Sequence, residues 1–348
     1  MDQQRFYLSG YGQPGEVTVR GYTLDPATGR CTLRTEDASL RNPSYLLRHP
    51  EKPVLYAVEE VRPEGGVVAL EDGSWKPLAA LPSGGAWPCH LALSPDGRFL
   101  LVSHYADGCL TVFELDDGGV PVRMTDTVRH VMTDADREGA DPLRQECAHI
   151  HFSLCDGERV FVVDLGLNAV FVYGWDAEHG RLIDHGERLD FPQKAGPRHL
   201  TVSDDGRFLY VLCELNAQVH VFARDGERWR RVQVASTVPE DFTAFADFDY
   251  SIGAAIRLID SHTLCTSTRG HNSIALFDVS EDGTLSNRRI FPSEGRTPRD
   301  FAVIGDWLLV ADQDSGCLAV FRRVGDSLVP VSRVTDVGQP SCVCPASR

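Results

Sequence analysis

The sequence of 348 residues predicts an all-β protein, a seven-bladed β-propeller whose blades are four-stranded antiparallel sheets. Three observations predict this fold. One strand-rich motif recurs from residue 42 to residue 345, apolar and polar residues alternate with a period of two inside each copy, and no helical pattern separates the copies. Small sheets repeated around an axis leave only short, protected sheet edges, which is a stable way to build such an array.

The clearest copy of the motif is residues 196–222, GPRHLTVSDDGRFLYVLCELNAQVHVF. Strong copies begin at Trp87 and Cys147, weaker ones at Asn42, Gly253 and Thr297, and a truncated one at Gln339. A proline or alanine opens the inner strand of each copy: Pro43, Pro88, Ala148, Pro197, Ala254, Pro298 and Pro340. The intervals between these positions are 45, 60, 49, 57, 44 and 42 residues, so seven units fill the chain.

Each copy contains three apolar runs and a more polar fourth one. In the clearest copy the runs HLTVS, RFLYV and VHVF alternate with period two and are rich in β-branched and aromatic residues, as half-buried strands are. The Asp-Gly pair of SPDG and SDDG favours a tight hairpin turn between the first two strands. The following polar segment, such as RDGERWRRVQV, supplies an outer strand.

The two ends of the chain are expected to share one blade. The last copy, QPSCVCP, stops after a single strand, while the first residues, RFYLSGYGQPGEVTVRGYTLD, offer two or three strands without a leading one. Pairing of these strands would close the ring, so residues 1–348 are predicted to form one domain. Two β-sandwich domains are the alternative, but they would not explain one motif that returns along the whole chain.

Composition narrows the class of protein. Apolar residues make up 42% and charged residues 24%, which is typical of a globular protein, and no apolar run approaches the roughly 18 residues that a membrane span needs. The net charge of −16 argues against binding to nucleic acid or to an anionic membrane. The start of the chain lacks a signal-peptide pattern, and ten cysteines include no CxxC pair, so we expect a cytoplasmic protein with free thiols. A monomer or weak homo-oligomer is expected.

A propeller brings equivalent positions of its blades together at one mouth of the central channel. The residue after each aligned proline or alanine then forms a ring: Ser44, Cys89, His149, Arg198, Ala255, Arg299 and Ser341. The loop after each second strand returns to the same mouth and contributes Glu60, His104, Asp164, Glu214, Arg269, His271 and Asp312. Asp164 and Asp312 are explained by turn formation alone. Channel residues can also simply pair with one another, but Glu214 and Arg269 lack a turn role and are the better candidates for function.

Four segments closely resemble the bacterial lactonase family of seven-bladed propellers: residues 196–222, VVDLGLNAVFVY, STRGHNSIALF and TPRDFAVIGDWLLVADQDSGCLAVFR. That family includes one type of 6-phosphogluconolactonase, and the fungal carboxymuconate-lactonizing enzymes are its relatives. The resemblance covers nearly all of the chain. It implies a site at the channel mouth made of a histidine, two arginines and a glutamate, which by motif fall on His149, Arg198, Arg269 and Glu214.

The chain departs from the family pattern at four positions that are expected to line the pocket. Cys147 stands where a histidine is frequent, Ala255 where a glutamate is usual, and His104 and Cys213 where asparagines are common. These departures bear on the substrate more than on the fold.

The resemblance implies hydrolysis of a sugar-acid lactone, with a 6-phosphogluconolactonase-like activity that needs no cofactor. Lactone hydrolysis requires a base to activate water and donors for the developing oxyanion. Glu214 or His149 is the expected base, and Arg198 and Arg269 the expected anion-binding pair, because the planar guanidinium suits bidentate contacts. The expected further substrate contacts are His90, His104, His151 and Arg299.

Several alternatives remain open at this point. Cys89 or Cys147 with a neighbouring histidine imitates a Cys-His nucleophile pair. His149 and His151, with Glu214 or Asp164, have ligand types that suit a divalent metal, although no metal is expected. The same residue types also serve a carboxymuconate-type cycloisomerase, which closes a lactone. Finally, a propeller that binds a ligand without turnover is possible, because a fold alone does not give a function.

Overall fold

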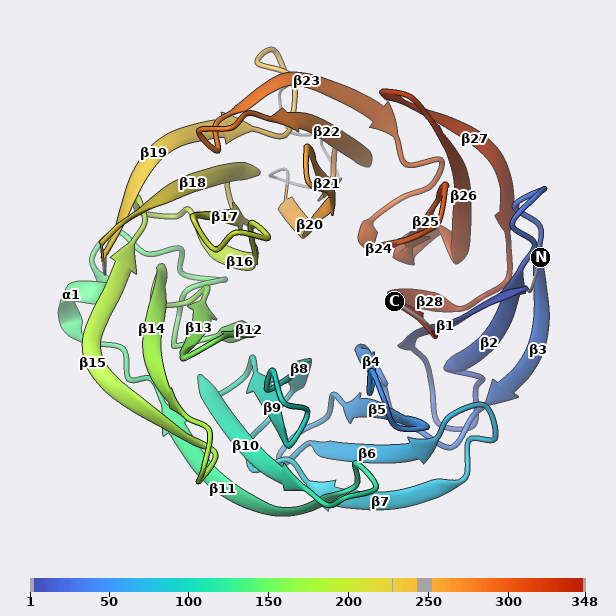
Figure 1. Cartoon of the computed structure of the whole chain (residues 1–348), viewed down its shortest axis with the longest axis horizontal. Helices are drawn as coiled ribbons and strands as arrows, with labels where there is room; N and C mark the ends of the chain where they lie inside the picture. The colour runs from blue at the N-terminus through green and yellow to red at the C-terminus, as the bar shows by residue number, and fades with distance from the viewer. Residues whose placement is uncertain (1–2, 227, 243–251, 347–348) are drawn as a thin grey trace.

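The computed structural model describes residues 3–226, 228–242 and 252–346, and these form seven four-stranded antiparallel sheets arranged as blades around a central channel (Figure 1). The predicted seven-bladed propeller is therefore confirmed. Within the described residues the helical content is one turn of α-helix, α1 (Asp134–Arg137), and one short 3₁₀ turn, Gln313–Ser315. None of the described helices is long and apolar enough to cross a membrane.

Each blade contributes one strand to each of four layers. The innermost strands are β4 (Leu46–Arg48), β8 (Pro88–Leu93), β12 (Ile150–Asp156), β16 (Pro197–Val202), β20 (Ile252–Asp260), β24 (Pro298–Ile304) and β28 (Gln339–Pro345). The second strands are β1 (Gln4–Tyr11), β5 (Val54–Glu59), β9 (Phe99–His104), β13 (Arg159–Asp164), β17 (Phe208–Cys213), β21 (Thr263–Arg269) and β25 (Trp307–Asp312). The third strands are β2 (Val19–Leu24), β6 (Gly66–Glu71), β10 (Cys109–Leu115), β14 (Ala169–Asp176), β18 (Gln218–Asp225), β22 (Ser273–Val279) and β26 (Cys317–Val324). The outer strands are β3 (Cys31–Asp37), β7 (Pro77–Pro82), β11 (Pro121–Arg129), β15 (Arg181–Asp190), β19 (Arg228–Ser236), β23 (Leu285–Pro292) and β27 (Ser327–Val334).

The ends of the chain close the ring as the sequence predicts. Strand β28 forms the inner edge of the sheet β28-β1-β2-β3 and pairs antiparallel with β1. The register shifts at Gly10, where a Cβ atom would overlap the carbonyl group of Gln339. Glycine is needed there because the two backbones approach too closely for a side chain.

The core lies between the blades rather than inside any one of them. Seven apolar clusters each join two neighbouring blades; one of them packs Phe6 of β1 against Leu309 of β25. Because neighbouring blades cover both faces of a sheet, the second strands are buried over most of their length, and every residue of β17 is buried. The expectation of half-buried strands was therefore wrong for this layer, whereas the outer strand β15 is mostly exposed.

Several polar residues at the ends of the second strands hold the incoming loops instead of facing the channel. His104 at the end of β9 is completely buried, with Nδ1 3.1 Å from the carbonyl oxygen of Cys109 and Nε2 2.9 Å from the Ser83 hydroxyl. Asp164 at the end of β13 lies 2.7 Å from Nδ1 of His130. The turn role expected of Asp164 agrees with its contacts, because it also accepts the backbone N–H of Leu167.

Asp312 ends β25 as Asp164 ends β13, and the burial of its carboxyl group can be tested. Burial raises the pKa of its carboxyl group from 3.8 to about 8, against the opposing effect of the Ser293 hydroxyl. A carboxyl group whose pKa is raised on folding favours the folded state most below pH 3.8, and this contribution is lost as the pH rises towards 8. We expect Asp312→Asn to raise the melting temperature at pH 9 relative to the wild type, and to do so much less at pH 5. A difference between the two proteins that is the same at both pH values would contradict this explanation.

Candidate active site

The leading ends of the inner strands and the trailing ends of the second strands meet around a cavity of about 230 Å³ at one mouth of the channel. Its lining is polar and aromatic: Tyr11, Glu60, Trp87, Cys89, Tyr105, Arg144, His151, Glu214, Arg269 and Arg299. A space of about 10 Å³ continues into the channel and is lined by Arg198 and His199. Charged groups from several blades therefore converge at this mouth, as the sequence analysis expected.

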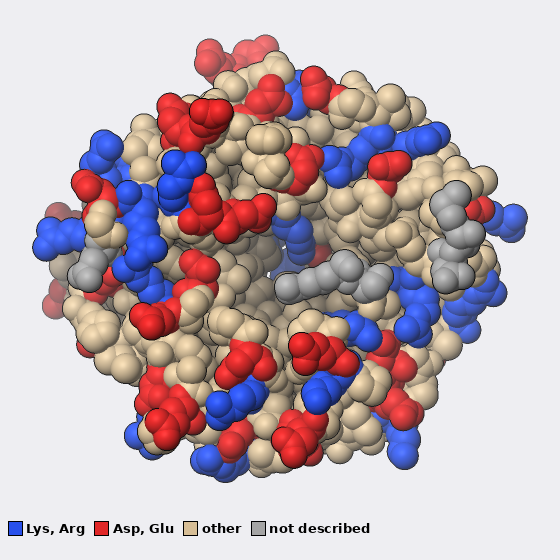
Figure 2. Space-filling model, in the orientation of Figure 1, with Lys and Arg blue, Asp and Glu red and all other residues tan. Residues whose placement is uncertain are grey.

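A larger hollow of about 1260 Å³ lies at the opposite ends of the inner strands. Figures 1 and 2 look onto this face, where acidic and basic side chains are interspersed around a central hollow. The arginines that line the larger hollow pair with aspartates: Arg48 with Asp72 at 2.8 Å and Arg257 with Asp300 at 2.7 Å. The smaller cavity at the other mouth gathers more unbalanced charge and is the better candidate for a site.

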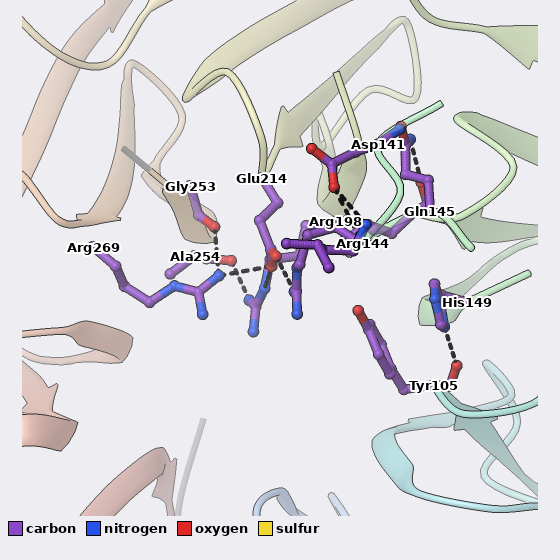
Figure 3. Close-up of polar contacts among 12 residues, drawn as sticks. Tyr105, Asp141, Arg144, Gln145, His149, Arg198, Glu214, Gly253, Ala254 and Arg269 are labelled. Carbon is purple, nitrogen blue, oxygen red and sulfur yellow. Dashed lines mark hydrogen bonds and ion pairs between the residues drawn. The ribbon is translucent and has the colours of Figure 1, made fainter. Parts of the chain in front are cut away.

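Glu214 is the centre of the charged group at this mouth. It follows β17, is 1% exposed, and accepts hydrogen bonds from Nε of Arg198 at 3.0 Å and Nη2 of Arg269 at 2.7 Å (Figure 3). Nη2 of Arg144 forms a third ion pair with the same carboxylate. Burial opposes ionisation of Glu214, but the charges of the three arginines outweigh it and hold its pKa well below the usual range. Glu214 is thus a permanently ionised carboxylate and a weak base.

Two of these arginines are held in place by backbone carbonyl groups at the start of β20. Arg198 opens β16, is 2% exposed, and donates from Nη1 to the carbonyl oxygen of Ala254. Arg269 ends β21 and donates from Nη2 to the carbonyl oxygen of Gly253 at 3.2 Å. Burial, together with the charge of Arg269, lowers the pKa of Arg198 to about 9. The guanidinium group of Arg198 therefore remains charged at neutral pH.

Arg144 was missed by the sequence analysis. It lies in the segment between β11 and β12, where the backbone N–H of Arg144 donates to the side chain of Asp141 at 3.0 Å and the side chain of Gln145 donates to the carbonyl oxygen of Leu165 at 2.9 Å (Figure 3). The signal available in the sequence was the 60-residue interval from Pro88 to Ala148, the longest between repeats. Extra length at the channel mouth is where a loop residue can enter the site.

A second set of contacts lines another side of the cavity and includes Glu60, which follows β5. Nη2 of Arg299 donates to the hydroxyl oxygen of Tyr11 at 2.8 Å, and the Tyr11 hydroxyl donates to Oε2 of Glu60 at 2.8 Å. Burial raises the pKa of Glu60, although Arg299 acts in the opposite direction. The cavity thus holds two carboxyl groups, Glu60 and Glu214, whose pKa values are shifted in opposite directions, a pattern common at acid–base sites.

His149 lies behind Tyr105 rather than in the cavity lining. Its ring stacks on that of Tyr105, with centroids 4.1 Å apart, and Nδ1 donates to the carbonyl oxygen of Tyr105 at 2.6 Å (Figure 3). Its Nε2 lies 3.2 Å from a carboxylate oxygen of Glu146. Tyr105 therefore separates His149 from the cavity in this conformation.

The predicted substrate contacts divide into two groups. His151 and Arg299 line the cavity. His90 lies deeper, with its ring centroid 4.5 Å from that of Tyr45 and 4.1 Å from that of Phe152. His104 is held by the carbonyl group of Cys109 and by the hydroxyl group of Ser83, which follows β7 of the preceding blade. Burial and the nearby charge of Arg198 hold the pKa of His151 well below its usual range, so its ring is neutral.

The departures from the family pattern lie outside the cavity lining, contrary to the expectation. Cys213 is completely buried in an apolar cluster between two blades, and Ala255 is completely buried in another. Neither these two residues nor Cys147 and His104 line the mouth cavity.

The structure does not assemble the metal ligand set considered from the sequence. Asp164 is occupied by His130 and by backbone N–H groups, including that of His149 at 2.8 Å. Within the described part of the chain, one group of possible ligands lies close together: Glu146, Cys147 and His149. The sulfur atom of Cys147, however, is 3.9 Å from Nδ1 and 3.7 Å from Nε2 of His149, so it lies off the direction of either lone pair. This position is not that of a Cys-His nucleophile pair, in which the thiol lies along the lone pair of one ring nitrogen.

Comparison with known proteins agrees with this architecture. A family model described as "Lactonase, 7-bladed beta-propeller" matches residues 5–345. The chain is 29% identical to 6-phosphogluconolactonase from Bacillus subtilis over 97% of both chains. Among solved structures, it resembles the periplasmic gluconolactonase of Pseudomonas aeruginosa, with a TM-score of 0.88, 28% identity and coverage of 99% of both chains. A protein from Lactobacillus plantarum aligns with a TM-score of 0.90 and 28% identity over 99% of this chain and 100% of that one. The chain belongs to the lactonase family of seven-bladed β-propellers.

The role of Glu214 in stability can be tested by replacing it with glutamine. The substitution leaves the buried guanidinium groups of Arg198 and Arg269 without a compensating charge, and breaking a buried ion pair in this way costs about 3 kcal/mol or more. We expect Glu214→Gln to lower the free energy of unfolding in urea by that amount, whereas the exposed control Glu281→Gln leaves it unchanged. Equal stability of the two variants would show that the arginines do not depend on this carboxylate.

Proposed function

We propose that the chain hydrolyses a lactone of an anionic sugar acid, with 6-phosphoglucono-1,5-lactone as the substrate that fits best. The observation that carries this proposal is the convergence of four guanidinium groups at one mouth of a lactonase propeller: Arg144, Arg269 and Arg299 line the cavity, and Arg198 lines the space that continues from it. Glu60 and Glu214 balance two of these charges at most. This mouth of the channel, counted with Arg198, therefore carries at least two unbalanced positive charges in a protein whose net charge is −16, and such a site attracts anions.

A phosphate dianion suits this arrangement. Arginine forms strong bidentate contacts with phosphate, and Arg144, Arg269 and Arg299 line the cavity. Two relatives act on lactones by name, the 6-phosphogluconolactonase of Bacillus subtilis and the periplasmic gluconolactonase of Pseudomonas aeruginosa. Both names support a lactone substrate, but only the first names a phosphorylated lactone. The positive charge of the cavity favours the phosphorylated lactone.

The assignment of roles follows from charge and position. We assign Arg144, Arg198 and Arg269 to binding the anion and to stabilising the oxyanion that develops on the lactone carbonyl group. Glu214 holds these arginines together, and its low pKa makes it unsuited to abstracting a proton. A role for His149 as base requires Tyr105 to move aside, because the two rings are stacked. His151 and Arg299 complete the contacts with the substrate.

The location, oligomeric state and partners of the protein stay predictions from the sequence. We propose a cytoplasmic monomer or weak homo-oligomer that binds a small anionic lactone and neither nucleic acid nor a membrane. The acidic net charge supports this view.

Substrate selectivity gives the direct test, with Arg144→Ala as the variant because Arg144 is less buried than Arg198 and Arg269. A hydrogen bond to a charged group contributes about 1.5–3 kcal/mol, so kcat/KM for 6-phosphoglucono-1,5-lactone should fall by about 10- to 100-fold, and that for glucono-1,5-lactone much less. Acid release is followed by pH-stat after subtraction of spontaneous hydrolysis. The matched control is Arg137→Ala, an exposed arginine of the same segment. Absence of turnover of both lactones by the wild type would contradict the proposed function.

A further inference from the structure

We propose that Glu60 is the general base and acid of the lactone hydrolysis proposed above, and that Tyr11 positions it. This inference rests on the proposed function, which supplies the reaction. Glu60 lines the same cavity as Arg144, Arg269 and Glu214, and it is half-buried at the end of its blade's second strand. It is therefore the second carboxyl group within reach of a ligand in this cavity.

Glu214 and Glu60 have different hydrogen-bond partners, and these partners suit the two carboxyl groups to different roles. Glu214 accepts from three guanidinium groups, so its lone pairs and its charge are already used. Glu60 accepts at Oε2 from the hydroxyl group of Tyr11, which is a neutral donor. A neutral partner holds the carboxyl group in place without fixing its charge, so the proton can be gained and lost during a reaction.

The surroundings of Glu60 make it a stronger proton acceptor than an ordinary carboxylate. The groups that face it come from five parts of the ring: Tyr11 of β1, Ser44 before β4, Cys89 of β8, Arg198 of β16 and Arg299 of β24. Burial disfavours the charged form more than the two arginines favour it, so the pKa of Glu60 is raised. A general base is most effective when its pKa is close to the pH at which it works.

Tyr11 connects this carboxyl group to the anion-binding side of the cavity. Arg299 donates to the Tyr11 hydroxyl oxygen at 2.8 Å and its guanidinium group lies over the tyrosine ring, 5.2 Å from the centroid. This contact leaves the hydroxyl proton directed at Glu60, since the oxygen accepts from Arg299. The orientation of the carboxyl group is thereby set by a rigid aromatic side chain and not by a mobile loop.

The step is a simple hydrolysis in which atoms and charges balance. Glu60 accepts a proton from a water molecule as the water oxygen forms a bond to the lactone carbonyl carbon. The carbonyl oxygen becomes an oxyanion next to the arginines. Its collapse breaks the bond between the carbonyl carbon and the ring oxygen, and the protonated Glu60 returns the proton to that oxygen. The product is the open hydroxy acid, and Glu60 is again ionised.

Glu60→Gln tests this role, with the exposed Glu64→Gln as the matched control four residues along the chain. We expect kcat for 6-phosphoglucono-1,5-lactone to fall by about 100-fold or more, which is the usual contribution of a general base, with KM and the affinity for inorganic phosphate nearly unchanged. The acidic limb of the kcat/KM profile should disappear in Glu60→Gln. It should persist in Glu60→Asp, which keeps a carboxyl group, and in Glu64→Gln.

The outcomes separate this inference from the proposed function. If the wild type hydrolyses the lactone and Glu60→Gln, folded by its melting temperature, keeps the wild-type kcat and acidic limb, the role of Glu60 is overturned while the lactonase activity stands. If the wild type turns over neither phosphorylated nor free gluconolactone, both fail together. A parallel loss of phosphate affinity in Glu60→Gln would also overturn the inference, because it would place Glu60 in anion binding.

Discussion

The arrangement of the channel mouth depends on one buried carboxylate. Glu214 brings together Arg198, Arg269 and Arg144, which belong to two blades and to a loop from a third part of the ring. Without it, these buried guanidinium groups would repel one another and pay the full cost of leaving water. The same contacts that stabilise the carboxylate make it a weak base. The centre of the site is thus an organiser of positive charge, and the proton chemistry has to come from another group.

The propeller makes this concentration of charge possible. Every blade begins its inner strand and ends its second strand at the same mouth, so single polar residues that are far apart in the sequence become neighbours (Figure 1). The seven apolar clusters between the blades carry the stability of the ring, which leaves the channel positions free for polar groups. A group such as Glu60 can then be kept half-buried in the cavity, where partial removal from water raises its pKa against the opposing charges of Arg299 and Arg198.

The sequence was sufficient for the fold and for part of the site. The repeat with its alternating strands predicts seven blades and their closure, and the equivalent positions predict that Arg198, Glu214 and Arg269 converge. The direction in which each side chain points could not be predicted from the sequence. His104 occupies an equivalent position, yet it turns towards Ser83 within the blade array, and His149 is covered by Tyr105. Equivalent positions fix where a Cα atom lies, whereas local hydrogen bonds decide where the side chain points. Arg144 lies outside the repeat, and only the long interval before Ala148 hinted at it.

The central claim is that the arginines around Glu214 bind the anionic group of a sugar-acid lactone. A crystal structure with 6-phosphogluconate, the product of the proposed reaction, tests it most directly. The account predicts that the phosphate group lies within hydrogen-bond distance of at least two of Arg144, Arg198, Arg269 and Arg299, with the carboxylate end of the product near Glu60. A cavity that stays empty at saturating product, or a product bound with its phosphate away from all four arginines, would contradict it.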